Sequence, residues 1–261
     1  MRRMLIFGLG YSASVIARAL ETRGWEVVST GRHGTLPFAD EYAVRRALDA
    51  AEAVLSSVPP DRDGADPVLE RYGEALAQRW TGYLSSTGVY GDTRGAWVDE
   101  TAPTGDGRRT ARAACDAAWL ARGARVFRLP GIYGPGRSAL DRVRQGTAHR
   151  IALSDQVFSR IHVDDLADGV VAGLDGPSGA YNLADDWPCS QNAVIEEACR
   201  LLGREPPPLQ QLEEAALSPM ARAFYAENRR VANLRARRVL GWVPRHCDYR
   251  TGLRAILAAG G

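Results

Sequence analysis

Short apolar runs alternate with segments in which apolar residues recur at helical spacing along most of the chain. The first run, Met4 to Phe7, ends at a glycine. It is followed by a helical pattern from Ser14 to Arg23 and a second apolar run from Trp25 to Ser29. A parallel strand buried on both faces has a continuous apolar sequence, and a helix then crosses to the next strand. The first thirty residues therefore predict one β-α-β unit.

The same alternation continues to residue 202. Further strands are predicted at 53–58, 82–86, 124–129 and 180–183, and helices at 42–50, 66–79, 110–122 and 192–202. We also expect Asp164 and Asp165 to cap a helix that runs to Leu174. This order of elements indicates the α/β class, with a doubly wound, mostly parallel sheet covered by helices on both faces.

The composition is that of an ordinary globular protein. Hydrophobic residues make up 45% and charged residues 25% of 261 positions, with a net charge of +2. These values argue against a disordered or nucleic-acid-binding chain. The first apolar run is interrupted by Gly8 and Gly10, which argues against a signal peptide, and no run is long enough to cross a membrane. We therefore expect a cytoplasmic protein with no nucleic-acid or membrane partner.

All 33 basic residues are arginine, so the chain contains no lysine. This excludes a Schiff-base lysine, a P-loop lysine and a tyrosine–lysine catalytic pair. The four cysteines are Cys115, Cys189, Cys199 and Cys247. They form no CxxC motif and have no zinc-like spacing with the four histidines, so we expect free thiols and no metal site.

A glycine-rich turn lies between the first predicted strand and helix. Its sequence, Gly8-Leu9-Gly10-Tyr11-Ser12-Ala13, fits the pattern G-x-G-x-x-G/A. The first glycine makes the tight turn, the second lets a pyrophosphate approach the backbone, and Ala13 permits close helix–strand packing. The helix N-terminus adds N–H groups and partial positive charge. The turn predicts a dinucleotide cofactor held by Gly8, Gly10, Tyr11, Ser12 and Ala13.

The end of the second strand indicates which dinucleotide binds. An NAD site usually has an acidic residue about 20 residues after the turn. This strand instead leads through Ser29-Thr30-Gly31 to Arg32, and the first carboxylates, Asp40 and Glu41, lie too far on. Because a guanidinium is a bidentate phosphate partner, Arg32 favours NADP(H) over NAD(H). The other interpretation of Arg32 is a solvated loop charge.

Further segments complete a recognisable set of motifs. They are Ser85 to Gly91 (SSTGVYG), Arg128 to Gly136 (RLPGIYGPG), Ile161 to Ala167 (IHVDDLA), Tyr181-Asn182-Leu183, and Leu240 to Pro244 (LGWVP). With the glycine-rich turn they follow in order along nearly the whole chain. On these residues the chain resembles the extended short-chain dehydrogenase/reductases of the NAD-dependent epimerase/dehydratase type, as an atypical branch similar to the short YeeZ-like proteins.

The resemblance implies two regions. One is a dinucleotide-binding, Rossmann-type core at 1–134, completed by 161–185. The other is a small, mainly C-terminal substrate-capping region at 135–160 and 186–261.

The resemblance also assigns residues to the site. It places the catalytic hydroxyl at Ser86, with Thr87 beside it. The remaining residues that it assigns to the cofactor, on the adenine side and along the nicotinamide, are Ser57, Val58, Pro59, Pro130, Gly131 and Ile132.

The Tyr-x-x-x-Lys pair of the family is missing from its expected place. Its two positions fall on Arg108 and Arg112. Arg112 can hold ribose hydroxyls, but a guanidinium does not exchange a proton near neutral pH. Tyr90 or Tyr133 are the candidates to replace the missing acid. Two functions stay open: an NADP(H)-dependent oxidoreductase or epimerase acting on a small hydroxyl or carbonyl compound, and a catalytically silent NADP(H) sensor or scaffold.

Phe158 occupies the position where many nucleotide-sugar enzymes of this family carry an arginine. The short chain also leaves room for only a small cap, so the resemblance favours a smaller substrate. Arg137 and Arg160 remain as substrate contacts for an anionic group. The cluster of alanines at 113–118 permits close helix packing between two copies, so a homodimer is a further prediction.

Overall fold

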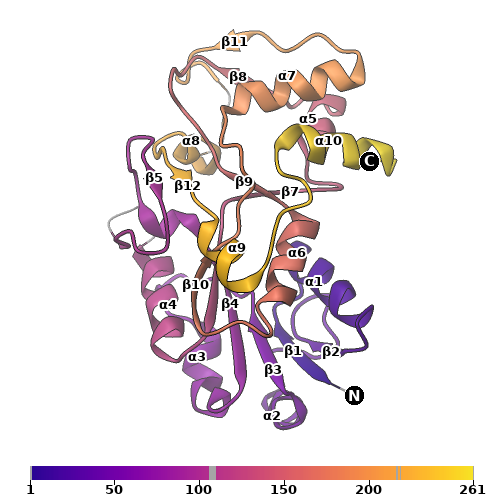
Figure 1. Ribbon diagram of the computed structural model, residues 1–261, viewed down its shortest axis with the longest axis vertical. Helices are drawn as coiled ribbons and strands as arrows, with labels where there is room; N and C mark the ends of the chain where they lie inside the picture. The colour runs from indigo at the N-terminus through magenta and orange to yellow at the C-terminus, as the bar shows by residue number, and fades with distance from the viewer. Residues whose placement is uncertain (1, 106–109, 216, 218, 261) are drawn as a thin grey trace.

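The computed structural model describes residues 2–105, 110–215, 217 and 219–260. Six strands form one parallel sheet in the order β10-β6-β4-β3-β1-β2 (Figure 1). Their bounds are β1 Arg3–Phe7, β2 Glu26–Ser29, β3 Ala53–Ser56, β4 Trp80–Ser86, β6 Arg125–Leu129 and β10 Gly179–Asn182. The chain adds β2 on one side of β1 and then returns to add β3 on the other. The strand order therefore reverses between β1 and β3, where this kind of sheet opens a crevice.

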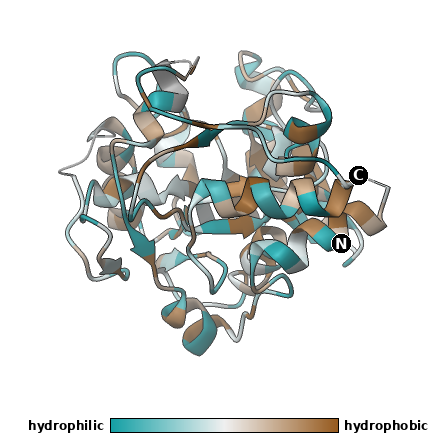
Figure 2. Cartoon of the chain, turned by 90° about the horizontal axis from the view of Figure 1, so that it is seen from above, coloured by the Kyte–Doolittle hydropathy of each residue, from teal (hydrophilic) through white to brown (hydrophobic). Residues whose placement is uncertain are grey.

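Helices cover both faces of the sheet. One face carries α1 (Tyr11–Glu21), α6 (Val163–Ala172) and α9 (Leu234–Leu240), and the other carries α2 (Glu41–Ala50), α3 (Pro67–Tyr72) and α4 (Thr110–Ala121). Strand β1 serves both layers, because Met4 and Ile6 pack on the first face while Leu5 and Phe7 pack on the second. Seen from above, the helices carry both polar and apolar residues along their length (Figure 2). The predicted doubly wound α/β class is confirmed.

Two predicted helices differ in detail from the structure. The helix expected at 66–79 ends at Tyr72 and continues as a short 3-10 segment, η1 (Gly73–Leu76). The predicted cap by Asp164 and Asp165 is wrong. The N-cap residue of α6 is His162, whose Nδ1 accepts a hydrogen bond from the Asp164 N–H at 3.2 Å. None of the described helices has the length and apolar character needed to span a bilayer.

A second layer of small elements lies over the carboxyl edge of the sheet (top of Figure 1). Its elements are α5 (Ala139–Arg144), β8 (Arg150–Ile151), α7 (Gln191–Leu202), β11 (Leu209–Gln210) and α10 (Tyr249–Ala258). The three helices of this layer, α5, α7 and α10, pack around an apolar cluster of their own. Ala236 and Trp242, by contrast, pack on the α1/α6 face of the sheet. Residues 186–261 are thus divided between the cap and the sheet layer.

Two short parallel pairings tie the layers together. β7 (Gly131–Tyr133) pairs with β9 (Arg160–His162), and β5 (Trp97–Val98) pairs with β12 (Arg230–Val231). The remaining elements are η2 (Thr87–Tyr90) and α8 (Pro219–Phe224).

A buried ion pair lies beneath the carboxyl end of β4. The Arg128 guanidinium donates to both carboxylate oxygens of Asp116, at 2.8 and 3.1 Å. The side chains are 4% and 1% exposed. Ser85 donates to the same carboxylate at 2.6 Å. A buried charge without its partner is costly, so this pair holds β4, β6 and α4 in one arrangement.

We expect Asp116→Ala to lower the free energy of unfolding by about 3–5 kcal/mol, because it leaves the Arg128 charge buried and unpaired. Urea denaturation followed by circular dichroism measures this loss. The control is Asp49→Ala: Asp49 is 80% exposed and lies 3.9 Å from Arg79. Its removal should change the free energy of unfolding by no more than about 0.5 kcal/mol. Equal losses in the two variants would contradict the assigned role of the buried pair.

Candidate functional site

A cavity of about 760 Å³ lies between the carboxyl edge of the sheet and the cap. Loops that follow β1, β3, β4 and β6 form one wall, and α5, α7 and α10 contribute to the other. The cavity brings together most of the predicted site residues: Gly10, Tyr11, Ser12, Ala13, Ser57, Ser86, Thr87, Arg112, Pro130, Gly131, Ile132, Arg137 and Arg160. Gly8, Arg32, Val58, Pro59 and Tyr90 do not line it.

The glycine-rich turn sits at the point where the strand order reverses. Gly8 has a φ of +85°, and a Cβ there would lie 3.0 Å from the Ser57 Oγ and 3.1 Å from a Val58 methyl group. Ser57 donates a hydrogen bond to the Gly8 carbonyl. The Leu9 N–H donates to the Thr30 carbonyl at 2.8 Å. The ends of β1, β2 and β3 therefore form one connected cradle.

The opposite side of the turn is open. A Cβ at Gly10 would meet nothing within 4 Å. Helix α1 begins directly after Gly10, with no side-chain cap and no acidic residue in its first turn. The first N–H groups of a helix lack intrahelical partners and favour an anion. The turn thus fits a pyrophosphate, with Tyr11, Ser12 and Ala13 beside it.

Arg32 follows the cradle at the end of β2. Gly31 has a φ of +116°, and a Cβ there would come within 3.1 Å of the Leu9 nitrogen. The backbone before Arg32 therefore lies against the glycine-rich turn. Arg32 is exposed and has no ion pair within the described part of the chain. Pro59 follows β3 and is exposed. It does not line the cavity, whereas Ser57 does.

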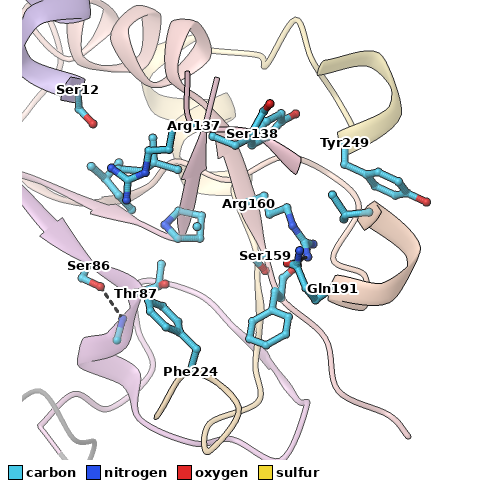
Figure 3. Close-up of a pocket in the computed structure, with 18 of the residues that line it drawn as sticks. Ser12, Ser86, Thr87, Arg137, Ser138, Ser159, Arg160, Gln191, Phe224 and Tyr249 are labelled. Carbon is cyan, nitrogen blue, oxygen red and sulfur yellow. Dashed lines mark hydrogen bonds between the residues drawn. The ribbon is translucent and has the colours of Figure 1, made fainter. Parts of the chain in front are cut away.

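Ser86 and Thr87 stand at the carboxyl end of β4 and face the cavity (Figure 3). The Ser86 Oγ accepts a hydrogen bond from the Gly88 N–H at 3.1 Å, drawn as the dashed line. This contact uses an acceptor site of the hydroxyl and leaves its hydrogen available for donation. The Ser86 hydroxyl hydrogen is thus available to a ligand in the cavity.

Tyr90 lies below the cavity instead of in it. Its hydroxyl donates to the Asn182 Oδ1 at 2.8 Å and accepts from Arg128 at 3.0 Å. Burial raises the pKa of Tyr90 to about 12. Tyr133 does line the cavity, and burial raises the pKa of its phenol strongly. The geometry therefore gives Tyr90 a structural contact in place of the predicted catalytic one.

Arg112 lies on α4 and lines the cavity. Its guanidinium donates to the Tyr83 hydroxyl at 2.8 Å, which fixes its direction. Arg108, the other position of the missing pair, lies outside the described residues. The positive charge of the family's lysine is therefore kept near its expected place, in a group that does not exchange protons.

The two predicted substrate arginines occupy different ends of the cavity (Figure 3). Arg137 lies with its guanidinium carbon 5.6 Å from the centre of the Tyr11 ring, on the side of the glycine-rich turn. Arg160 lies in the cap half, where it donates to the carbonyls of Phe158 at 2.8 Å and Cys189 at 3.1 Å. Arg160 thus lies on the cap side of the cavity, whereas Arg137 lies beside the glycine-rich turn.

Several cap residues that line the cavity are missing from the sequence-based set. They are Arg142, Gln145, His149, Gln191, Phe224, Tyr225 and Tyr249. None belongs to a motif, and the segments that carry them are brought together by cap packing. Only the position of Arg142 on a short amphipathic helix, next to the recognised glycine-rich loop, gives a signal in the sequence.

His162, Asp165 and His246 place potential metal-binding atoms within 4.8 Å of one another. Hydrogen bonds account for this cluster. The Asp165 carboxylate accepts from the N–H groups of Arg245 at 2.9 Å and His246 at 3.0 Å, and contacts the His246 ring at 2.9 Å. The cluster anchors the segment between α9 and α10 on α6, and it lies outside the cavity lining.

The sequence comparisons give two informative relatives. No family model matches the chain. The protein YeeZ of Escherichia coli K12 is 28% identical over 240 residues, which are 79% of this chain and 86% of YeeZ. A 3-diazoavenalumate denitrifying reductase of Streptomyces sp is 33% identical over 143 residues, 49% of this chain and 45% of that protein.

Solved structures match over almost the full length. A functionally unknown conserved protein from Silicibacter pomeroyi has a TM-score of 0.87 and 39% identity, covering 99% of both chains. Human epimerase family protein SDR39U1 with NADPH has a TM-score of 0.77 at 18% identity, over 98% of this chain and 99% of that one. The UDP-glucose 4-epimerase of Thermus thermophilus with NAD has a TM-score of 0.72 at 20% identity, with the same coverage.

These matches agree with the classification suggested by the glycine-rich turn, the strand order of the sheet and the motif around Ser86. The chain is thus similar to YeeZ along most of its length and has the fold of the NAD(P)-binding epimerases, which supports the resemblance to the extended short-chain dehydrogenase/reductases.

Proposed function

We propose that this protein binds NADP(H) and acts as an oxidoreductase or epimerase on a small hydroxyl or carbonyl compound. The observation that carries the proposal is a single cavity lined both by the glycine-rich turn and by Ser86. A dinucleotide laid from Gly10 along Pro130 and Ile132 would present its reactive end beside Ser86. When bound, the nicotinamide supplies hydride transfer, and the chain's residues orient the substrate.

The preference for NADP(H) rests on Arg32. An exposed guanidinium beside the cradle, with no acidic residue at the end of β2, suits a 2′-phosphate. Arg137, above Tyr11, would contact the pyrophosphate. The human relative was solved with NADPH and the Thermus epimerase with NAD, so the fold itself accepts either.

NADPH should bind more tightly than NADH, and Arg32→Ala should reduce NADPH affinity by about tenfold, the loss of one charge-assisted contact. Quenching of tryptophan fluorescence, with parallel calorimetry, measures both affinities. Arg238→Ala, which removes an exposed arginine on α9, serves as the control and should leave both unchanged. Equal affinity for NADH and NADPH in the natural chain would refute the role of Arg32.

Ser86 would donate its hydroxyl hydrogen to the substrate oxygen, with Thr87 beside it. Arg112 would hold the nicotinamide ribose. The proton that accompanies the reaction would come from the substrate side of the cavity or from water, because the Tyr90 phenol is engaged by Asn182 and Arg128.

We expect Ser86→Ala to lower kcat by about 10²-fold for any carbonyl compound that the protein reduces with NADPH, as for loss of one oxyanion donor. A panel of small aldehydes and ketones, read by NADPH absorbance, identifies such a compound. Tyr90→Phe, whose hydroxyl lies outside the cavity, should keep kcat within about twofold while costing roughly 1 kcal/mol of stability. A larger kcat loss in Tyr90→Phe than in Ser86→Ala would reverse the assignment.

The second candidate function is a catalytically silent NADP(H) sensor or scaffold. It is favoured by Arg112 in the place of the family's lysine and by the buried hydroxyl of Tyr90. The Streptomyces relative is named as a reductase, which supports the enzymatic function over the sensor. NADPH binding without turnover over a broad panel would favour the sensor.

We further propose a homodimer that packs through α4. Ala114 and Ala117 are exposed on this helix, whereas Ala113 is buried. A cytoplasmic location stays a prediction from the sequence.

A further inference from the structure

The cavity as a whole carries positive charge that its carboxylates do not balance. Five arginines face the cavity, and the described lining contains two carboxylates, Asp141 and Glu227. Asp141 accepts from the Ser138 N–H at 2.7 Å and closes the N-terminus of α5. Glu227 pairs with Arg229 at 2.7 Å. The charges of Arg142 and Arg160 thus lack a carboxylate partner in the described lining.

Arg142 projects from α5 into this space near Arg160 and Tyr225. Its guanidinium makes no ion pair or hydrogen bond with the part of the chain that the structure describes. Arg142 is open to solvent through the cavity, and the protein surrounding it, together with the positive charge of Arg160, lowers its pKa. Two guanidiniums that raise each other's electrostatic energy are stabilised by an anion bound between them.

Arg160 is held in a fixed direction by neutral groups. In addition to the two carbonyls, it donates to the Gln191 Oε1 at 3.2 Å. The Asp185 carboxyl interacts electrostatically with Arg160 but lies outside the cavity lining, and burial raises its pKa above its usual range. Arg160 makes no ion pair with a carboxylate of the cavity lining. These contacts use both terminal nitrogens of Arg160, so they hold its positive charge in place and binding of an anion costs little further side-chain entropy.

Aromatic rings stand next to the two arginines. Phe158 and Tyr225 pack edge to face, with ring centres 5.6 Å apart. Phe224 also lines the cavity, on the side of Thr87 (Figure 3). A ligand whose charged end meets the guanidiniums would rest its body on these rings.

We propose that Arg142 and Arg160 form an oxyanion subsite that binds a carboxylate or phosphate group of the substrate, with Phe158 and Tyr225 beside its apolar body. This inference rests on the proposed function and narrows it, because it selects organic acids or phosphate esters among hydroxyl and carbonyl compounds. Bound at this end of the cavity, the substrate would extend toward Ser86.

Thermal unfolding of the full chain tests the subsite. The probes are benzoate, inorganic phosphate and the neutral isostere benzamide, each at constant ionic strength set with sodium chloride, with and without NADPH. Benzoate or phosphate should raise Tm in a saturable way, and benzamide should not. Arg142→Gln should weaken that binding by about tenfold or more and leave the NADPH-induced shift intact. Arg144→Gln, on the same helix but outside the cavity lining, should behave as the natural chain.

The outcomes separate the two proposals. Stabilisation by benzoate alone assigns a carboxylate, and stabilisation by phosphate alone assigns a phosphate ester. NADPH stabilisation with no effect of either anion beyond chloride would overturn the subsite and keep the cofactor proposal. Anion stabilisation without any NADPH effect would support the subsite and overturn the proposed function. Equal anion affinity in Arg142→Gln and the natural chain would also overturn the subsite.

Discussion

The ion pair between Asp116 and Arg128 is the constraint on which the catalytic edge of the sheet depends. It joins α4 to β6 where almost no solvent reaches, and Ser85 adds β4 to the same carboxylate. Ser85 is adjacent to Ser86, so the pair sets the height and direction of the proposed catalytic hydroxyl. Water would compete with such contacts at the surface, whereas in the interior the hydrogen bonds must be complete for the charges to be tolerated.

The same network extends to the far edge of the sheet. Arg128 also donates to Tyr90, whose hydroxyl reaches Asn182 at the end of β10. Asn182 donates onward to the Ala232 carbonyl, just after β12. Strand β12 in turn pairs with β5, which follows β4 and η2 in the chain. This pairing joins the segment after the cap to the β4 side of the cavity. Core and cap are thus joined by hydrogen bonds beneath the cavity, which fix the spacing of the two surfaces that line it.

The sequence predicts the cofactor half of the site better than the substrate half. The glycine-rich turn and the β1–β2 unit are local, because adjacent residues make both the strand–turn–helix geometry and the anion site. Ser86 is assigned by the resemblance of its motif, and the structure places it in the cavity lining at the carboxyl end of β4. Arg142 and Tyr225 lie far apart in the chain and meet only through cap packing, which no short pattern encodes. Tyr90 shows the reverse error, since its motif position suggested chemistry while its contacts are structural.

The replacement of lysine by arginine constrains the chemistry more than the fold. Arg112 keeps a positive charge on α4, and its hydrogen bond to Tyr83 keeps that charge in place. A guanidinium does not deprotonate near neutral pH, so it lends electrostatic support but takes no part in a proton relay. Orientation then has to come from elsewhere in the cavity. An anionic group bound by Arg142 and Arg160 would provide it by fixing the far end of the substrate. The reacting carbon would be held near Ser86, so that a polarising hydroxyl and water are sufficient where the family uses a tyrosine and a lysine.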